Sequence, residues 1–162
     1  MTVVSSGTPV TSWSEPDGIA PRGTLIVLPG RGEGPELYER FGRRISSDAY
    51  RVQVVANPAE DAALAVSQIS RQLSGPAPVV LVGSDTGALF AAGLLASGQV
   101  AGVDALVLAG LPAAADPPAA GWEAELDART ACPTHRGKLA GPGLRRGPST
   151  TPFRTAGCHS LT

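Results

Sequence analysis

The sequence predicts an α/β domain, in which a parallel β-sheet carries helices on both faces. Four short apolar runs rich in β-prone residues lie between residues 24 and 109, and a segment with helical character follows each of the first three. The first run, Thr24–Leu28, is continuously apolar, as expected of a strand that is covered on both faces. Because crossovers between parallel strands are right-handed, the helices are expected on both faces of the sheet.

The first predicted strand and helix are joined by a glycine-rich connection. The strand is expected at Thr24–Leu28, after one or two short edge strands around Thr8–Trp13. Residues 29–35 follow, and Pro35 suits the first position of a helix because its missing N–H is not needed there. Apolar side chains then recur every four residues, which predicts an amphipathic helix packed on the sheet: Leu37, Phe41 and Ile45.

The other elements repeat this order. A second strand is expected at Val52–Val55, and Asn57 with Pro58 is expected to cap the second helix. The predicted buried face of that helix consists of Ala62, Ala65, Val66, Ile69 and Leu73. Two strands flanking a helix that is apolar nearly all round complete the set: Val79–Val82, Gly87–Ser97 and Ala105–Ala109.

The composition indicates one globular domain with many loops. The 162 residues are 43% hydrophobic and include 20 glycines and 15 prolines. We expect a core over residues 1–111, a linker with a lid-like helical segment over 112–140, and a disordered basic tail over 141–162. The net charge of -1 hides an asymmetry, because no acidic residue follows Asp127.

Some classes of protein are disfavoured. The two cysteines, Cys132 and Cys158, form no disulfide framework and no metal motif, so neither a metal nor a cofactor is expected. The N-terminus lacks the features of a signal peptide, and no apolar stretch approaches the ~18 residues of a membrane span. We therefore expect a cytoplasmic protein without a membrane partner. The basic tail lacks nucleic-acid motifs, so nucleic acid is not an expected partner.

The segment that organises the chain is Gly83-Ser84-Asp85-Thr86-Gly87, between the third predicted strand and its helix. So tight a turn forces its middle residue towards strained backbone angles, and glycines two residues before and after relieve the crowding. The turn also lifts the Asp85 side chain clear of the sheet at the positive end of the helix. Ligands of such sheets bind at the carboxyl ends of the strands, where this turn and residues 29–34 both lie.

These features make the chain resemble the α/β-hydrolase family over roughly residues 8–111. The segment 83–87 is similar to the family's nucleophile elbow, G-x-nucleophile-x-G. Leu28-Pro29-Gly30-Arg31-Gly32-Glu33-Gly34 with Tyr38 resembles the H-G-x-G-E-H…Y loop of the monoglyceride-lipase and lysophospholipase-like branch. The resemblance implies a partial α/β-hydrolase fold. Because no further strand with its acid and histidine is evident after Ala109, we expect a C-terminally truncated member.

The resemblance implies a hydrolase of a small ester-like or related substrate, with Asp85 at the nucleophile position. Aspartate at this position is similar to haloalkane dehalogenases and epoxide hydrolases, whose carboxylate forms an ester that a histidine-activated water hydrolyses. The backbone N–H groups of Thr86 and Arg31 would stabilise the oxyanion. His159 or His135 is the candidate base, since the chain has no other histidine.

Several alternatives remain open. Ser84 is a second candidate nucleophile, and the alternative role for Asp85 is to cap the following helix without taking part in catalysis. A dinucleotide-binding module would also place glycines between a strand and a helix, although Gly30, Gly32 and Gly34 do not match its spacing. A non-catalytic remnant would bind a small molecule or a partner chain, and the sheet edge after Ala105–Ala109 would favour self-association.

Overall fold

The computed structural model describes residues 10–112 together with residues 124, 131 and 133. The chain divides into two units, Met1–Ala114 and Ala115–Thr162, and the elements described below all belong to the first. The predicted tail over 141–162 and nearly all of the predicted segment 112–140 lie outside the described residues. So do both histidines and both cysteines.

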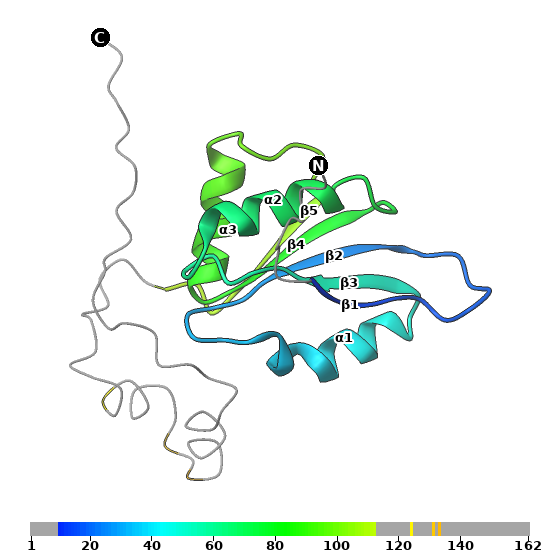
Figure 1. Cartoon of the computed structure of the whole chain (residues 1–162), viewed down its shortest axis with the longest axis horizontal. Helices are drawn as coiled ribbons and strands as arrows, with labels where there is room; N and C mark the ends of the chain where they lie inside the picture. Colours follow the sequence, from blue (N-terminus) through cyan, green and yellow to red (C-terminus); the bar gives the residue numbers. More distant parts are fainter. Residues whose placement is uncertain (1–9, 113–123, 125–130, 132, 134–162) are drawn as a thin grey trace, which may run out of the picture. The chain divides into compact units, whose positions relative to one another are not determined.

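The first unit is built on a five-stranded sheet in the order β1-β3-β2-β4-β5 (Figure 1). Its strands are β1 Thr11–Trp13, β2 Gly23–Leu28, β3 Tyr50–Val54, β4 Val79–Ser84 and β5 Ala105–Ala109. The last four are parallel to their neighbours, and β1 is antiparallel to β3. All four predicted strands are present within a residue or two of their expected bounds, with β1 as an edge strand.

Helices cover both faces of this sheet, so the predicted α/β class is confirmed. The 3-10 helix η1, Pro35–Tyr38, opens at the predicted proline and runs into α1, Glu39–Ser46. The other two helices are α2, Ala62–Gln72, and α3, Thr86–Ala96. In Figure 1, α1 lies on one face of the sheet, and α2 and α3 lie on the other.

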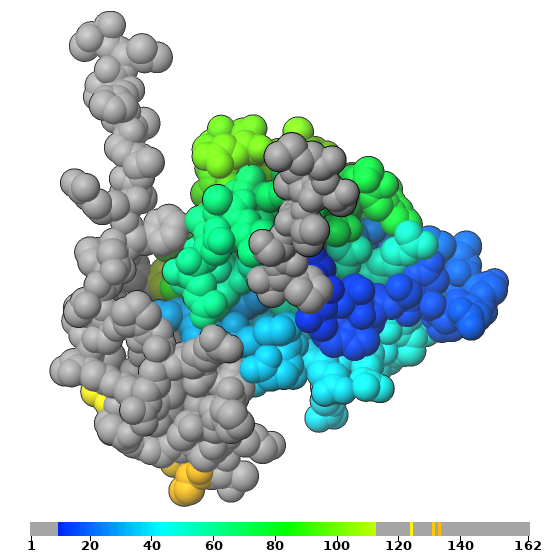
Figure 2. Space-filling model, viewed as in Figure 1, coloured from blue at the N-terminus to red at the C-terminus, as the bar shows by residue number. Residues whose placement is uncertain are grey.

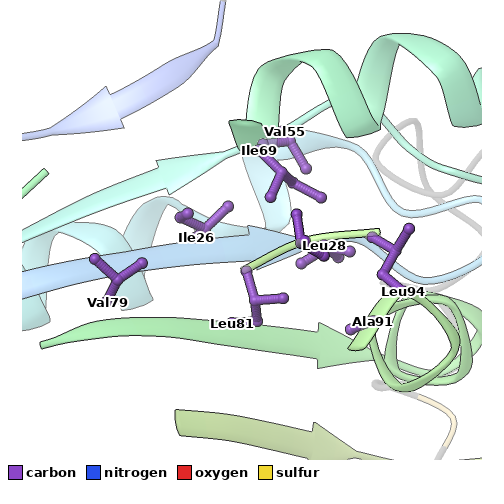
Figure 3. Packing of buried hydrophobic residues seen from close by; sticks show 9 residues of the cluster. Ile26, Leu28, Val55, Ile69, Val79, Leu81, Ala91 and Leu94 are labelled. Atoms are coloured by element: carbon purple, nitrogen blue, oxygen red, sulfur yellow. The ribbon is translucent and has the colours of Figure 1, made fainter. Parts of the chain in front are cut away.

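The core has two layers because the central strand β2 is buried on both faces. Ile26 and Leu28 point to the layer beneath α2 and α3, where Ile69, Leu81 and Ala91 surround them (Figure 3). Val27 points the other way, into a second layer that contains Val52, Val54, Phe41 and Ile45. This alternation explains the continuous apolar run in β2, since every second side chain meets a different helical layer.

The two edges of the sheet differ. At the β1 edge, Trp13 lies so close to α1 that a Cβ on Gly42 would stand 2.6 Å from its ring atom Cζ3. β1 and α1 therefore lie side by side at the surface (Figure 2). At the opposite edge, Val107 of β5 is 47% exposed and Leu108 is 41% exposed. Among the described residues, β5 pairs with β4 alone.

The predicted cap of the second helix is wrong. α2 begins at Ala62, and the carboxylate of Asp61 caps it by accepting a hydrogen bond from the Leu64 N–H at 2.9 Å. Asn57 lies further upstream, where its Oδ1 accepts from the Ala59 N–H at 2.9 Å. Its Nδ2 donates elsewhere, to the carbonyl of Gly30, and this contact belongs to the candidate site.

A search for membrane-spanning segments among the described residues found no helix with sufficient length and apolar character.

Candidate functional site

The order of the strands changes direction at β2 and β4. From β2 the chain crosses to β3 on one side, and it then returns to β4 on the other side of β2. The connections after β2 and β4 therefore leave in opposite directions, and such a switch point is where α/β sheets bind ligands. We call residues 29–34 the β2 turn and residues 83–87 the β4 turn. Leu28 pairs with Gly83, which sets the two turns side by side.

Asp85 is the strained residue of the β4 turn. Its backbone has φ 47° and ψ −119°, in a region that non-glycine residues seldom occupy. Two sets of backbone hydrogen bonds maintain this conformation. The Asp85 N–H donates to the Ala109 carbonyl at 2.9 Å, and the Asp85 carbonyl accepts from Ala88 at 3.0 Å and Leu89 at 3.3 Å.

The Asp85 side chain does not cap α3. Asp85 occupies the N-cap position, but its carboxylate makes no capping hydrogen bond. The interpretation of Asp85 as a side-chain cap is therefore wrong, because its backbone lacks the extended conformation from which an N-cap side chain reaches the first helical N–H groups. The same strain distinguishes Asp85 from Ser84, which has no positive φ and ends β4 as an ordinary strand residue.

The glycines on either side of Asp85 are required by close packing, as the spacing predicted. A Cβ on Gly83 would lie 2.7 Å from the Gly87 carbonyl oxygen and would overlap with Ala88. A Cβ on Gly87 would lie 2.9 Å from the carbonyl carbon of Leu28 and would overlap with the carbonyl oxygens of Leu28 and Pro29. The start of α3 thus rests directly on the backbone where β2 ends, which leaves no room for side chains.

The β2 turn is maintained by polar side chains. One carboxylate oxygen of Glu33, Oε2, accepts hydrogen bonds from the Gly30 N–H at 2.6 Å and from the Tyr38 hydroxyl. The other oxygen, Oε1, accepts from the Ser84 hydroxyl at 3.1 Å. Asn57 lies on the other side of the turn and donates from Nδ2 to the Gly30 carbonyl at 2.7 Å. Gly32 has a positive φ of 73°, which glycine adopts without strain.

Burial raises the pKa of the Tyr38 hydroxyl above its ordinary value, and the Glu33 carboxylate that accepts its proton raises it further. Tyr38 is thus a neutral donor throughout the physiological range. The hydroxyls of Tyr38 and Ser84 both donate to the Glu33 carboxylate, and hydrogen bonds to an ionised acceptor are stronger than those between neutral groups.

Asp85 and Glu33 both lie close to Gly30, at the place where a side chain would begin. A Cβ on Gly30 would lie 2.8 Å from the Asp85 Cβ and 2.9 Å from Glu33 Oε2. Gly30 therefore lets the two turns approach each other. The Thr86 N–H follows Asp85 in the first turn of α3, where helical N–H groups have no carbonyl within the helix to bond. The positive end of the α3 helix dipole lies at this same end of the helix, next to Asp85.

The structure brings some of the predicted site residues together. Asp85, Thr86 and Arg31 lie on the two adjacent turns, with the Arg31 side chain exposed. His135 and His159 lie outside the described residues, so the predicted base stays a prediction. Within the described part of the chain, no three histidine, cysteine or acidic side chains are grouped to hold a metal ion. The sequence did not reveal the anchoring roles of Asn57, which bonds Gly30 across 27 residues, and of Glu33, which bonds Ser84 across 51 residues as well as the nearby Gly30 and Tyr38.

Comparison with known proteins gave loose structural likenesses only. No protein-family model and no curated protein matches the sequence. One solved structure is a thermostable carboxyl esterase from Bacillus coagulans in complex with glycerol, with 18% identity and a TM-score of 0.47 over 60% of this chain and 37% of that one. Another is a thioesterase domain from the curacin biosynthetic pathway, with 22% identity and a TM-score of 0.48 over 68% of this chain and 43% of that one.

Both of these proteins have the α/β-hydrolase fold. This chain spans less than half the length of either of them. The likeness is too loose to transfer an activity, so the description of the site depends on the strand order, the backbone of Asp85 and the contacts of the two turns.

Proposed function

We propose that the chain is a hydrolase of the α/β-hydrolase type that acts on a small ester-like or related substrate through Asp85. The observation that supports this proposal is the positive φ of Asp85 at a turn from strand to helix. Close packing requires the glycines two residues before and after Asp85, Gly83 and Gly87. In α/β-hydrolases the nucleophile occupies a sharp, strained turn of this kind at the top of the sheet. Strain of this size persists where function requires it.

The proposed chemistry has two steps. A carboxylate oxygen of Asp85 attacks a substrate carbon and displaces a halide or opens an epoxide, which leaves an ester on Asp85. Water then attacks the carbonyl carbon of that ester, the alcohol leaves, and the carboxylate is restored. The N–H groups of Thr86 and Arg31 would stabilise the oxyanion of the second step. His159 or His135 would remove the proton from the water.

Carbon–halogen and epoxide substrates fit Asp85 better than carboxylic esters do. A carboxylate is a weak nucleophile towards an ester carbonyl, because attack there yields an anhydride that is less stable than the ester. At saturated carbon, by contrast, loss of halide or relief of epoxide strain drives the displacement. Asp85 thus favours substrates with an electrophilic saturated carbon within the proposed class.

A substrate panel with defined variants tests this proposal. We expect turnover of an alkyl halide or epoxide by the wild type, and a loss of at least about 100-fold in Asp85→Asn because the amide cannot form the ester. Asp17→Asn makes the same change in an exposed turn and should leave the rate unchanged. A single turnover in heavy-oxygen water should place the heavy atom in the Asp85 carboxylate. Equal activity of Asp85→Asn and wild type would remove Asp85 from the mechanism.

A second candidate function is non-catalytic association through β5, with a second copy of this chain as the partner. The observation that favours it is the exposure of Val107 and Leu108 on the outermost strand. Residues 105–111 contain no charged side chain, so two copies could pair edge to edge without repulsion. Sedimentation should then show a dimer that Val107→Lys disrupts. Ile19→Lys is the matched control, because Ile19 is 53% exposed away from this edge.

The dinucleotide-binding alternative has less support. A phosphate would need the N–H groups of the glycine-rich turn after β2, as in that family. The Gly30 N–H already donates to the Glu33 carboxylate, whose negative charge would repel a phosphate at this position.

A further inference from the structure

The Gly30–Arg31 peptide is the part of the β2 turn with the most specific anchoring. One side chain contacts it directly, Asn57 after β3, and two more act on the backbone next to it: Tyr38 in η1 and Ser84 at the end of β4. The last two act through Glu33, which also accepts the Gly30 N–H. A surface turn needs no such set of anchors to connect a strand to a helix.

Two donors hold the carbonyl of this peptide, the Asn57 side chain and the Glu33 N–H, which donates at 3.0 Å. The Asn57 Nδ2 donates to the Gly30 carbonyl at 2.7 Å and to the Glu33 carbonyl at 3.3 Å. The Gly30 carbonyl and the Arg31 N–H belong to one planar trans peptide, so they point in opposite directions. When Asn57 holds the carbonyl on its own side, the Arg31 N–H points to the side away from Asn57. Asn57 is only 8% exposed, so water cannot readily replace it as the donor.

Glu33 fixes the other end of the same turn. Its Oε1 accepts from the Ser84 hydroxyl, which joins the β2 turn to the residue directly before Asp85. Its Oε2 accepts the Gly30 N–H, so the two peptides flanking Gly30 are both constrained. The Gly30 backbone is thereby kept next to the Asp85 Cβ.

We propose that Asn57 and Glu33 are positioning residues that hold the Gly30–Arg31 peptide so that the Arg31 N–H is presented to the reaction centre beside Asp85. The proposal depends on the hydrolase function proposed above. Neither side chain touches the substrate. Asn57 acts on the orientation of one N–H donor, and Glu33 acts on the distance between the β2 turn and the β4 turn.

The decisive variant is Asn57→Asp. It has the same shape and keeps the oxygen that accepts from Ala59, but it replaces the donor to the Gly30 carbonyl with an acceptor. The new carboxylate repels the Gly30 carbonyl and leaves it only the Glu33 N–H as a donor, so the peptide is held less firmly. We expect kcat to fall by about 100-fold, as when one oxyanion donor is lost, with KM changed less than about threefold. Gln99→Glu makes the same amide-to-carboxylate change at an exposed position and should leave both constants unchanged.

A second measurement does not need activity. Backbone amide NMR should show a changed Arg31 N–H resonance and faster exchange at Arg31 in Asn57→Asp, with the Gln99→Glu spectrum like the wild type. If Asn57→Asp does not fold, Asn57→Ser provides the same readouts with a shorter side chain that no longer reaches the Gly30 carbonyl.

The outcomes separate this proposal from the proposed function. An unchanged kcat and an unchanged Arg31 resonance in a folded Asn57 variant would overturn the positioning role, even if Asp85→Asn is inactive. An apparent kcat that falls only in proportion to the fraction of folded protein, with KM unchanged, would also overturn it, since that result indicates a purely structural role. A wild type inactive on every substrate would count against the hydrolase, while the Arg31 resonance would still decide whether Asn57 orients the peptide.

Discussion

The β2 turn and the β4 turn lie at the same edge of the sheet, but they are built on opposite principles. The β2 turn has one backbone hydrogen bond, from the Glu33 N–H to the Gly30 carbonyl, and is otherwise held by the side chains of Glu33, Tyr38 and Asn57. The β4 turn is held by the absence of side chains, since Gly83 and Gly87 allow backbone to pack on backbone. The β2 turn can therefore be loosened by removing single side-chain hydrogen bonds, whereas a change in the β4 turn would have to displace α3.

The largest expected effect comes from a substitution that disrupts the β4 turn. Gly87→Ala should destabilise the fold by at least about 3 kcal/mol, because its Cβ would overlap with backbone oxygens that cannot move aside. Gly93→Ala in the same helix is the control, since nothing lies within 4 Å of its Cβ position, and it should stabilise the fold by about 0.5–1 kcal/mol. Urea unfolding measures both. Equal stability of the two variants would contradict the packing described for Gly87.

The next effect loosens the β2 turn. Tyr38→Phe removes one donor to the Glu33 carboxylate and should lower the free energy of unfolding by about 1.5–3 kcal/mol, as expected for a hydrogen bond to a charged group. Unlike Gly87→Ala, it should leave α3 in place, so helical circular dichroism should match the wild type. If Tyr38→Phe is as stable as the wild type, the hydrogen bond from Tyr38 to Glu33 contributes nothing to the stability of the β2 turn.

The two turns also differ in how far the sequence reveals them. The β4 turn is visible in its local spacing, because glycines two residues either side of Asp85 predict a crowded strand-to-helix turn. The four parallel strands were predictable for the same reason, since each is a local apolar run. The anchors of the β2 turn were not, because Glu33 meets Ser84 across 51 residues and Asn57 meets Gly30 across 27.

Asn57 shows how a local rule fails. An asparagine before a proline and an acidic helical start fits the pattern of an N-cap, and Asp61 fits it equally well. Only the strand order decides between them, because it brings the end of β3 next to the β2 turn and gives Asn57 a buried carbonyl to bind. Strand order depends on contacts between distant residues and cannot be read from a window of the sequence.

A smaller effect is the dependence of stability on pH that Tyr38 gives to the β2 turn. Tyr38 has a raised pKa in the folded chain, whereas the unfolded chain loses this proton near the ordinary value of 10.0. Above that pH the folded state binds more protons than the unfolded state, so stability is present below pH 10.0 and falls as the pH rises, by up to about 1.4 kcal/mol per pH unit. Urea unfolding from pH 9 to 11 should show this slope in the wild type but not in Tyr38→Phe. If stability fell equally with pH in the wild type and in Tyr38→Phe, Tyr38 would be excluded as the source of the slope.

The smallest expected effect tests whether the β4 turn retains strain for function. Asp85→Gly should raise the free energy of unfolding by about 1 kcal/mol, because glycine adopts a positive φ without a Cβ penalty. Asp85→Ala is the control, since it removes the carboxylate but keeps the Cβ and should not gain that stability. The same variants should both be inactive in the substrate panel, because each lacks the nucleophile. If Asp85→Gly is more stable but inactive, Asp85 is a position where conformational strain serves chemistry. Removing an anchor of the β2 turn, by contrast, should always lower the stability of the fold.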